Sequence, residues 1–215
     1  MRSKLFSLVF AAAIAASLVS CGKNAESGKS EKTAILGAKE FEEKFSDVET
    51  PSDGAQLSIS NTTAKAGGIA EVTLSVNNAD GKWSMCGIHI AYPDVFECRI
   101  EDGTEKNVEY TAGAALNGAA ATVAMDWYDR GSLPEELSKA HKSCLFITTM
   151  FVGDGGGDGD IATFYFRVPD NAQSGAVYPI EVYYRDGDLF TNSAADDSYQ
   201  KYAFSHAVNG SVTIE

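Results

Sequence analysis

The sequence is short of cysteine, and its four cysteines follow no metal-binding or disulfide spacing. None stands in a C-x-x-C pair. With Cys21 assigned below to another role, Cys86, Cys98 and Cys144 leave an odd number. This argues against a disulfide framework or a zinc site. Each of the three lies in an apolar alternating run, so we expect small buried hydrophobic side chains.

The sequence also lacks a recognisable catalytic set. His89, His141 and His206 follow no metal-protease spacing, and no G-x-S-x-G nucleophile motif is present. The stretch 126–129 (Asp-Trp-Tyr-Asp) resembles the carboxylate–aromatic patch of a glycoside hydrolase. Such catalysis needs a second carboxylate at a fixed separation, and the sequence supplies none at a deducible distance. We therefore expect a protein that is not an enzyme, without cofactor or metal.

Positive charge is scarce. The chain has 17 Lys and Arg against 30 Asp and Glu, which gives a formal net charge of −13. Removal of an N-terminal segment containing Arg2 and Lys4 would take this value to −15. Such a surface repels nucleic acid and anionic lipid headgroups, so we expect no nucleic-acid partner. It accommodates a neutral or basic protein surface or an uncharged polysaccharide.

The long apolar run of the sequence lies at its start. Residues 1–20 combine two early positive charges with an Ala-rich stretch and the small Ser20, the pattern of a signal peptide. Leu18-Val19-Ser20-Cys21 is the tetrapeptide that bacteria cut and lipidate. We expect cleavage before Cys21, acylation of its thiol, and a membrane-anchored lipoprotein on the extracellular face.

Residues 21–54 are expected to form a tether. The stretch 22–32 is polar, whereas 35–45 could form a short helix with Phe41 and Phe45 on one side. The turn residues 51–54 (Pro-Ser-Asp-Gly) end this segment. Residues 55–215 then form one domain, long enough to bury its own core.

Alternation of apolar and polar residues predicts that this domain is all-β. Val72, Leu74 and Val76 alternate with polar residues, as do Phe164 and Phe166. Nine short strands give a nine-stranded antiparallel jelly-roll β-sandwich with one short inserted helix. We place the strands at about 56–60, 69–77, 84–92, 95–101, 120–128, 143–152, 160–168, 177–184 and 204–214.

The inserted helix is expected from Ser132, which can cap it, to about Lys142, with Pro134 and two glutamates in its first turn. A glycine-rich acidic loop follows at 153–160. Its three aspartates could ligate calcium, but the EF-hand pattern fails because Tyr165 stands where a glutamate is required. We prefer a mobile hairpin loop, and the acidic pairs at 186–188 and 196–197 are interpreted in the same way.

Several elements occur in an order known from one family. The stretch 64–78 leads from a glycine turn into an alternating strand, and 87–97 contains Tyr92-Pro93-Asp94. The stretch 159–168 is followed by Ala172-Gln173-Ser174-Gly175, and the chain ends in Asn-Gly-Ser-Val-Thr-Ile at 209–214. Over residues 55–215 the sequence resembles a cohesin domain, the receptor module of bacterial cellulosomes. It departs from that family in Tyr-Pro-Asp, where Tyr-Asp-Pro is usual.

The resemblance implies a monomeric, non-catalytic jelly roll that binds a dockerin, a small helical module on another protein that carries its own calcium. It also implies that one flat sheet forms the binding face. Matching strands gives outward candidates on three of them. For the strand at 143–152 both phases are apolar, and we choose Thr148 and Met150 over Ile147 and Thr149. The predicted partner-binding residues are Gly87, His89, Ala91, Thr148, Met150, Thr163, Tyr165 and Arg167.

Two functions follow from this sequence. The first is a cell-surface receptor that attaches dockerin-bearing enzymes or scaffolding proteins to the membrane. The alternative is a carbohydrate-binding lipoprotein in which strand aromatics stack on sugars. The aromatic candidates for that role are Trp83, Trp127, Tyr183 and Tyr184.

Overall fold

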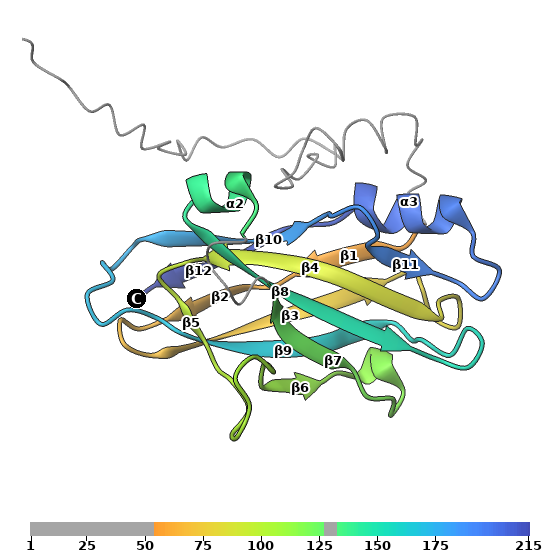
Figure 1. Cartoon of the computed structure of the whole chain (residues 1–215), viewed down its shortest axis with the longest axis horizontal. Coiled ribbons are helices and arrows are strands. Elements are labelled where there is room, and N and C mark those ends of the chain that lie inside the picture. The colour runs from red at the N-terminus through yellow and green to blue at the C-terminus, as the bar shows by residue number, and fades with distance from the viewer. Residues whose placement is uncertain (1–53, 127–132) are drawn as a thin grey trace, which may run out of the picture. The chain divides into compact units, whose positions relative to one another are not determined.

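Two packed β-sheets make up the part of the chain that the computed structural model describes, residues 54–126 and 133–215 (Figure 1). The five-stranded sheet contains β1 (Gln56–Ile59), β3 (Ile69–Asn77), β9 (Gly159–Arg167), β5 (Glu97–Cys98) and β6 (Tyr110–Ala112). The seven-stranded sheet contains β2 (Asn61–Ala64), β12 (Gly210–Ile214), β10 (Val177–Tyr183), β4 (Met85–Pro93), β8 (Lys142–Met150), β7 (Thr122–Asp126) and β11 (Leu189–Thr191). The predicted all-β jelly-roll sandwich is confirmed.

Strict alternation places the core between the sheets. On β3, Val72 and Leu74 point inward and are buried, while Glu71, just before Val72, is exposed. On β9, Phe164 and Phe166 are buried in the same way. Period-two side-chain direction therefore explains which half of each strand forms the core. The predicted strands at 69–77, 84–92, 143–152, 160–168 and 177–184 all match observed ones to within two residues.

Backbone hydrogen bonds close both lateral edges of the sandwich. On one side the Ile59 amide donates to the Val208 carbonyl, and the Val208 amide donates to the Leu57 carbonyl, each at 2.8 Å. On the other side the Val108 amide donates to the Val123 carbonyl of β7 at 2.9 Å. These hydrogen bonds connect β1 with the segment before β12 on one side, and the segment before β6 with β7 on the other.

Several predicted elements were wrong in detail. The strand expected at 95–101 is reduced to β5, and the chain returns as β6, which was not predicted. The strand expected at 204–214 begins only at Gly210, because α3 (Asp197–Ser205) precedes it. Strands β2 and β11 were also missed, and β2 pairs with β12 in parallel, so the sandwich is not wholly antiparallel.

Residues 196–197, at the start of helix α3, were interpreted from the sequence as part of an acidic loop. The N-terminus of this helix is capped by the Asp196 side chain, which accepts a hydrogen bond from the Ser198 amide at 2.9 Å. The ring of Phe204 meets that of Tyr184 edge-on at 5.0 Å, which seats the helix against the core. An aspartate followed by a run of helix-compatible residues is an N-cap signal, and it was available in the sequence.

The inserted helix is shorter than predicted. Helix α2 covers Glu135–Lys139, and Pro134 occupies its N-cap without a side-chain hydrogen bond. His141 adopts a left-handed backbone conformation (φ 54°), after which β8 begins at Lys142. The helix therefore ends before Lys142, and the expected cap at Ser132 lies outside the described residues. A short 3-10 helix, η1 (Ala114–Leu116), completes the helical elements described.

The predicted signal peptide (1–20), Cys21 and the tether up to residue 53 also lie outside the described residues. Within the described ranges, no helix has the length and apolar character needed to cross a membrane.

Candidate docking surface

The eight predicted partner-binding residues lie on opposite sides of the sandwich. Strands β4 and β8 belong to the seven-stranded sheet, whereas β9 belongs to the five-stranded sheet. Gly87, His89, Ala91, Thr148 and Met150 therefore point away from Thr163, Tyr165 and Arg167 across the core. The expectation that all eight share one flat face is wrong, and each outer face has to be considered separately.

On the outer face of the five-stranded sheet, Thr163 and Arg167 are engaged by their own chain. The Thr163 and Thr73 hydroxyls of neighbouring strands lie 2.9 Å apart. Arg167 Nη2 lies 3.1 Å from Asp170 Oδ1, in an exposed ion pair. Both side chains remain partly or fully accessible, but they lie in a hydrogen-bonded polar surface.

Tyr165 is held in the same polar surface. Its hydroxyl lies 2.5 Å from Thr111 Oγ1, and the Arg99 guanidinium lies 5.4 Å from the centre of its ring. Arg99 also pairs with Glu109 at 2.9 Å. A tyrosine whose ring and hydroxyl already have partners is less suited to serve as an anchor for another protein.

One end of the outer face of the seven-stranded sheet is covered by α2. Leu137 of this helix packs with Ala91, Cys144 and Tyr183, and all four are buried. The Tyr183 hydroxyl donates to Glu136 Oε1 at 2.7 Å, which fastens the helix to β10. Ala91 points away from the core as predicted but is not accessible, because the apolar side chain of Leu137 lies over it.

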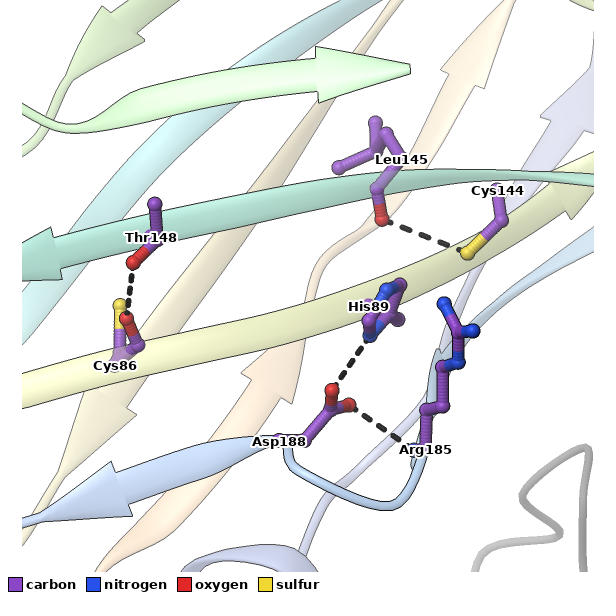
Figure 2. Close-up of polar contacts among 7 residues, drawn as sticks. All are labelled: Cys86, His89, Cys144, Leu145, Thr148, Arg185 and Asp188. Atoms are coloured by element: carbon purple, nitrogen blue, oxygen red, sulfur yellow. Dashed lines mark hydrogen bonds and ion pairs between the residues drawn. The ribbon is translucent and has the colours of Figure 1, made fainter. Parts of the chain in front are cut away.

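A buried polar pair occupies the middle of this face (Figure 2). His89 Nδ1 lies 2.6 Å from Asp188 Oδ1, and the second oxygen of Asp188 accepts from the Arg185 amide at 3.1 Å. The imidazole also packs on the Phe146 ring, with centroids 4.6 Å apart. Burial raises the pKa of the Asp188 carboxyl above its ordinary value. His89 is thus a fixed internal residue rather than an exposed contact residue.

Burial also governs two of the thiols of the domain, Cys86 on β4 and Cys98 on β5 of the opposite sheet. Cys86 is buried in the core side of β4, and burial raises its pKa to about 12. Cys98, half-buried, has a pKa raised to about 12 for the same reason. A thiol with such a pKa stays protonated at neutral pH and is a poor nucleophile.

The other end of the face is open. Strand register aligns Thr122, Thr148, Gly87 and Leu189 in one row across β7, β8, β4 and β11. The next row, at the start of β4 and the end of β8, pairs Met85 with Met150. Met150 is 70% exposed and Leu189 36% exposed.

Phe146 borders this row on the side of the buried pair. Its ring lies over Gly87, so that a Cβ added to Gly87 would be 3.2 Å from Phe146 Cζ. Thr148 turns its hydroxyl inward to the Cys86 carbonyl at 3.0 Å. We call the accessible side chains of this end the uncharged patch, because none of them is ionisable. Its members are Met85, Thr122, Phe146, Thr148, Met150 and Leu189.

Two members of the uncharged patch, Thr148 and Met150, were predicted from the sequence as contact residues, whereas the other four were not. The sequence of β8 did not decide which side chains face outward. Phe146 and Cys144 on its outer side are as apolar as Ile147 on its core side. Leu189 follows an Asp-Gly-Asp turn, and a three-residue strand after such a turn carries little periodic signal.

The acidic glycine-rich loop is held in place by the rest of the domain. Asp154 accepts from the amide and hydroxyl of Ser193, and Asp158 accepts from the Ala79 amide at 2.6 Å. The Trp83 indole N–H donates to the Gly157 carbonyl at 2.9 Å. Within the described ranges, no three His, Cys, Asp or Glu side chains are grouped as metal ligands. The loop that was expected to be mobile is tied to the rest of the domain by these hydrogen bonds.

The aromatic side chains considered for sugar stacking are not accessible where they are described. Trp83, Tyr183 and Tyr184 are all buried. Trp127 lies outside the described residues, as does most of the stretch 126–129. An aromatic ring has to expose its face to stack on a sugar, so three of the four candidates cannot do so.

The chain was compared with known proteins in both sequence and fold. No protein-family model matches the sequence, and no curated protein is significantly similar to it. Solved structures do match. A type III cohesin from the cell-surface anchoring scaffoldin ScaE of Ruminococcus flavefaciens has a TM-score of 0.60 at 23% identity, over 75% of this chain and 88% of that one.

The chain has the cohesin fold. The sixth cohesin of scaffoldin B from Acetivibrio cellulolyticus, solved with a dockerin, has a TM-score of 0.55 at 15% identity, over 75% of this chain and 99% of that one. A type I cohesin–dockerin complex from Clostridium thermocellum has a TM-score of 0.51 at 16% identity, with the same coverage.

Proposed function

We propose that this chain is a non-catalytic receptor that binds a dockerin-bearing enzyme or scaffolding protein and attaches it to the cell surface through a lipid anchor. The observation that carries the proposal is the uncharged patch on a cohesin fold. Two of the structures with this fold are complexes of a cohesin with a dockerin. Dockerins are helical, and a flat face of apolar and small residues suits the approach of a helix.

The two outer faces differ in what they offer to a partner. On β9 and its neighbours the five-stranded sheet presents hydroxyls and charges that already bond to one another, such as Thr163 with Thr73, and its exposed apolar residue Ile69 stands at the start of β3. The seven-stranded sheet presents Met150 and Leu189 without an apolar cover. Complete burial of such a side chain contributes about 1.5–3 kcal/mol, whereas exposed ion pairs contribute little. This difference favours the seven-stranded sheet as the docking face.

The proposed site therefore keeps part of the set predicted from the sequence. Thr148 and Met150 belong to it as contact residues, and Gly87 lies in its floor. His89 and Ala91 support it from buried positions. Thr163, Tyr165 and Arg167 are outside the proposed site because they lie on the opposite sheet.

A capture experiment tests the proposed function. The exported chain, residues 21–215 with Cys21→Ser, is immobilised and exposed to calcium-loaded dockerin modules encoded in the same genome. We expect saturable retention of at least one dockerin and no retention of the chain on cellulose, xylan or starch. Retention on a polysaccharide with no dockerin bound would instead support the carbohydrate-binding alternative.

The membrane anchor is tested separately. Acylation of Cys21 would place two or three hydrocarbon chains in the bilayer, and that number anchors a protein stably. Cys21→Ser in the full-length chain is expected to move the protein from the membrane fraction to the soluble fraction of the cell envelope. Continued sedimentation with membranes would contradict lipidation at this residue while leaving dockerin binding open.

A further inference from the structure

The open end of the seven-stranded sheet is limited in size by the chain itself. Helix α2 covers Ala91, Cys144 and Tyr183 at one end of the face, and the His89–Asp188 pair fills its middle. On β7, β8, β4 and β11 the accessible part is the row across these strands together with the Met85–Met150 row beside it. Outer positions of β10, such as Val177, are exposed as well but lie outside the uncharged patch. A partner that contacts the uncharged patch therefore lies at one end of the sheet, away from α2.

The dimensions of this end match a single helix. Neighbouring strands lie about 4.8 Å apart, so the four strands span roughly 14 Å between their outer axes. Successive outward residues on one strand are about 7 Å apart, so the rows from Phe146 to Met150 span about 14 Å. An α-helix with its side chains is about 10–12 Å wide, so one helix fits and two do not.

The chemistry of this end is uniform. Every side chain of the uncharged patch is apolar or a threonine, although the chain as a whole has a net charge of −13. Gly87 and Thr148 in its centre are small, which lets a helix backbone approach closely. Arg185 and Asp186, in the turn before Leu189, are exposed and charged and are not members of the uncharged patch.

Resting on the proposed function, we propose that the dockerin engages this chain through one helix whose contact stripe is apolar and uncharged. The helix crosses β8, β4 and β11 at the end of the sheet away from α2. Recognition by apolar burial predicts an affinity that hardly depends on salt, because screening weakens only charge–charge contacts. Recognition by charged pairs would weaken steeply with salt.

Calorimetry with the dockerin retained in the capture experiment tests this inference. Met150→Asp and Leu189→Asp each place a charge in the uncharged patch and are expected to weaken binding more than tenfold. Val177→Asp is the matched control, since Val177 is 61% exposed on the outer side of β10 but far from the patch. It is expected to change the affinity less than twofold. Wild-type affinity should change less than threefold between 50 and 500 mM NaCl.

Three outcomes would overturn the inference. The first is unchanged affinity in both patch variants, with thermal unfolding like that of wild type. The second is a loss of wild-type affinity greater than tenfold in high salt. The third is a homodimer in sedimentation that Met150→Asp dissociates, which would assign the patch to a second copy of the chain. The absence of any dockerin ligand would instead contradict the proposed function.

Discussion

The His89 imidazole on β4 and the Asp188 carboxylate in the turn before β11 form a buried pair, 2.6 Å apart (Figure 2). The pair joins a central strand to the Arg185–Asp188 turn, since Asp188 also accepts from the Arg185 amide. Leu189 follows this turn directly and belongs to the uncharged patch. The pair therefore fixes the border of the proposed docking face.

The first prediction concerns the pH dependence of this pair. Burial raises the pKa of Asp188 in the folded chain above its value in the unfolded chain. Proton uptake at this carboxyl therefore favours folding at low pH, and the contribution is lost as pH rises through the raised pKa. Asp188→Asn removes this titration. Relative to wild type, the variant is expected to be more stable at pH 7.5 than at pH 4.

Urea unfolding at several pH values measures the difference. Asp170→Asn, which removes a largely exposed carboxylate, is the control variant. If Asp188→Asn instead loses stability relative to wild type as the pH rises from 4 to 7.5, burial does not raise the pKa of Asp188. Unchanged dockerin affinity in Asp188→Asn at neutral pH would show that the turn holds its place without this charge.

The second prediction concerns close packing at Gly156. An added Cβ there would overlap the Trp83 indole, which is fully buried and stacks on Phe190 at 5.1 Å. Gly156→Ala is therefore expected to lower the free energy of unfolding by about 1–3 kcal/mol or more. Gly155→Ala is the matched control, because its Cβ would lie in ordinary contact, 3.4 Å from Phe151 Cβ. Equal unfolding midpoints in denaturant for the two variants would refute this account.

How much of this structure can be predicted from the sequence depends on how far apart in the chain the interacting residues are. Alternation along β3, with Val72 inside and Glu71 outside, is local and was interpreted correctly. The sheet to which β9 belongs is set by pairing with β3, some ninety residues away, and no local pattern carries that information. This is why Tyr165 and Met150 were placed on one face although they lie on opposite sheets.

Coverage by other elements is equally hard to predict. The outward positions of β4 were identified correctly, but His89 and Ala91 are buried by the turn at Asp188 and by Leu137 of α2. Each of these neighbours is distant in sequence from the strand it covers. A period-two pattern gives the direction of a side chain and not what lies above it.

The third prediction concerns calcium. The carboxylates of the loop at 153–160 already accept hydrogen bonds, as Asp154 does from Ser193 and Asp160 from Ser75. Calcium binding would have to break these contacts, so millimolar calcium is expected to shift the Tm of the chain by less than about 1 °C. Chelation should nevertheless dissociate the dockerin complex, since the resemblance assigns the calcium to the dockerin. A calcium-dependent Tm that Asp154→Asn abolishes would instead identify a site in this loop.

The last prediction separates the two outer faces of the sandwich. Tyr165→Ala removes a hydroxyl contact with Thr111 and the ring beneath Arg99 on the five-stranded sheet. Loss of the hydrogen bond alone is expected to cost about 0.5–1.5 kcal/mol in the free energy of unfolding. Since the proposed docking face is on the other sheet, dockerin affinity should stay within twofold of wild type, whereas Met150→Asp should weaken it more than tenfold. Calorimetry on both variants, with denaturant unfolding of each, decides the point. If Tyr165→Ala weakens binding and Met150→Asp does not, the partner docks on the five-stranded sheet, and the polar surface around Tyr165 is the recognition site.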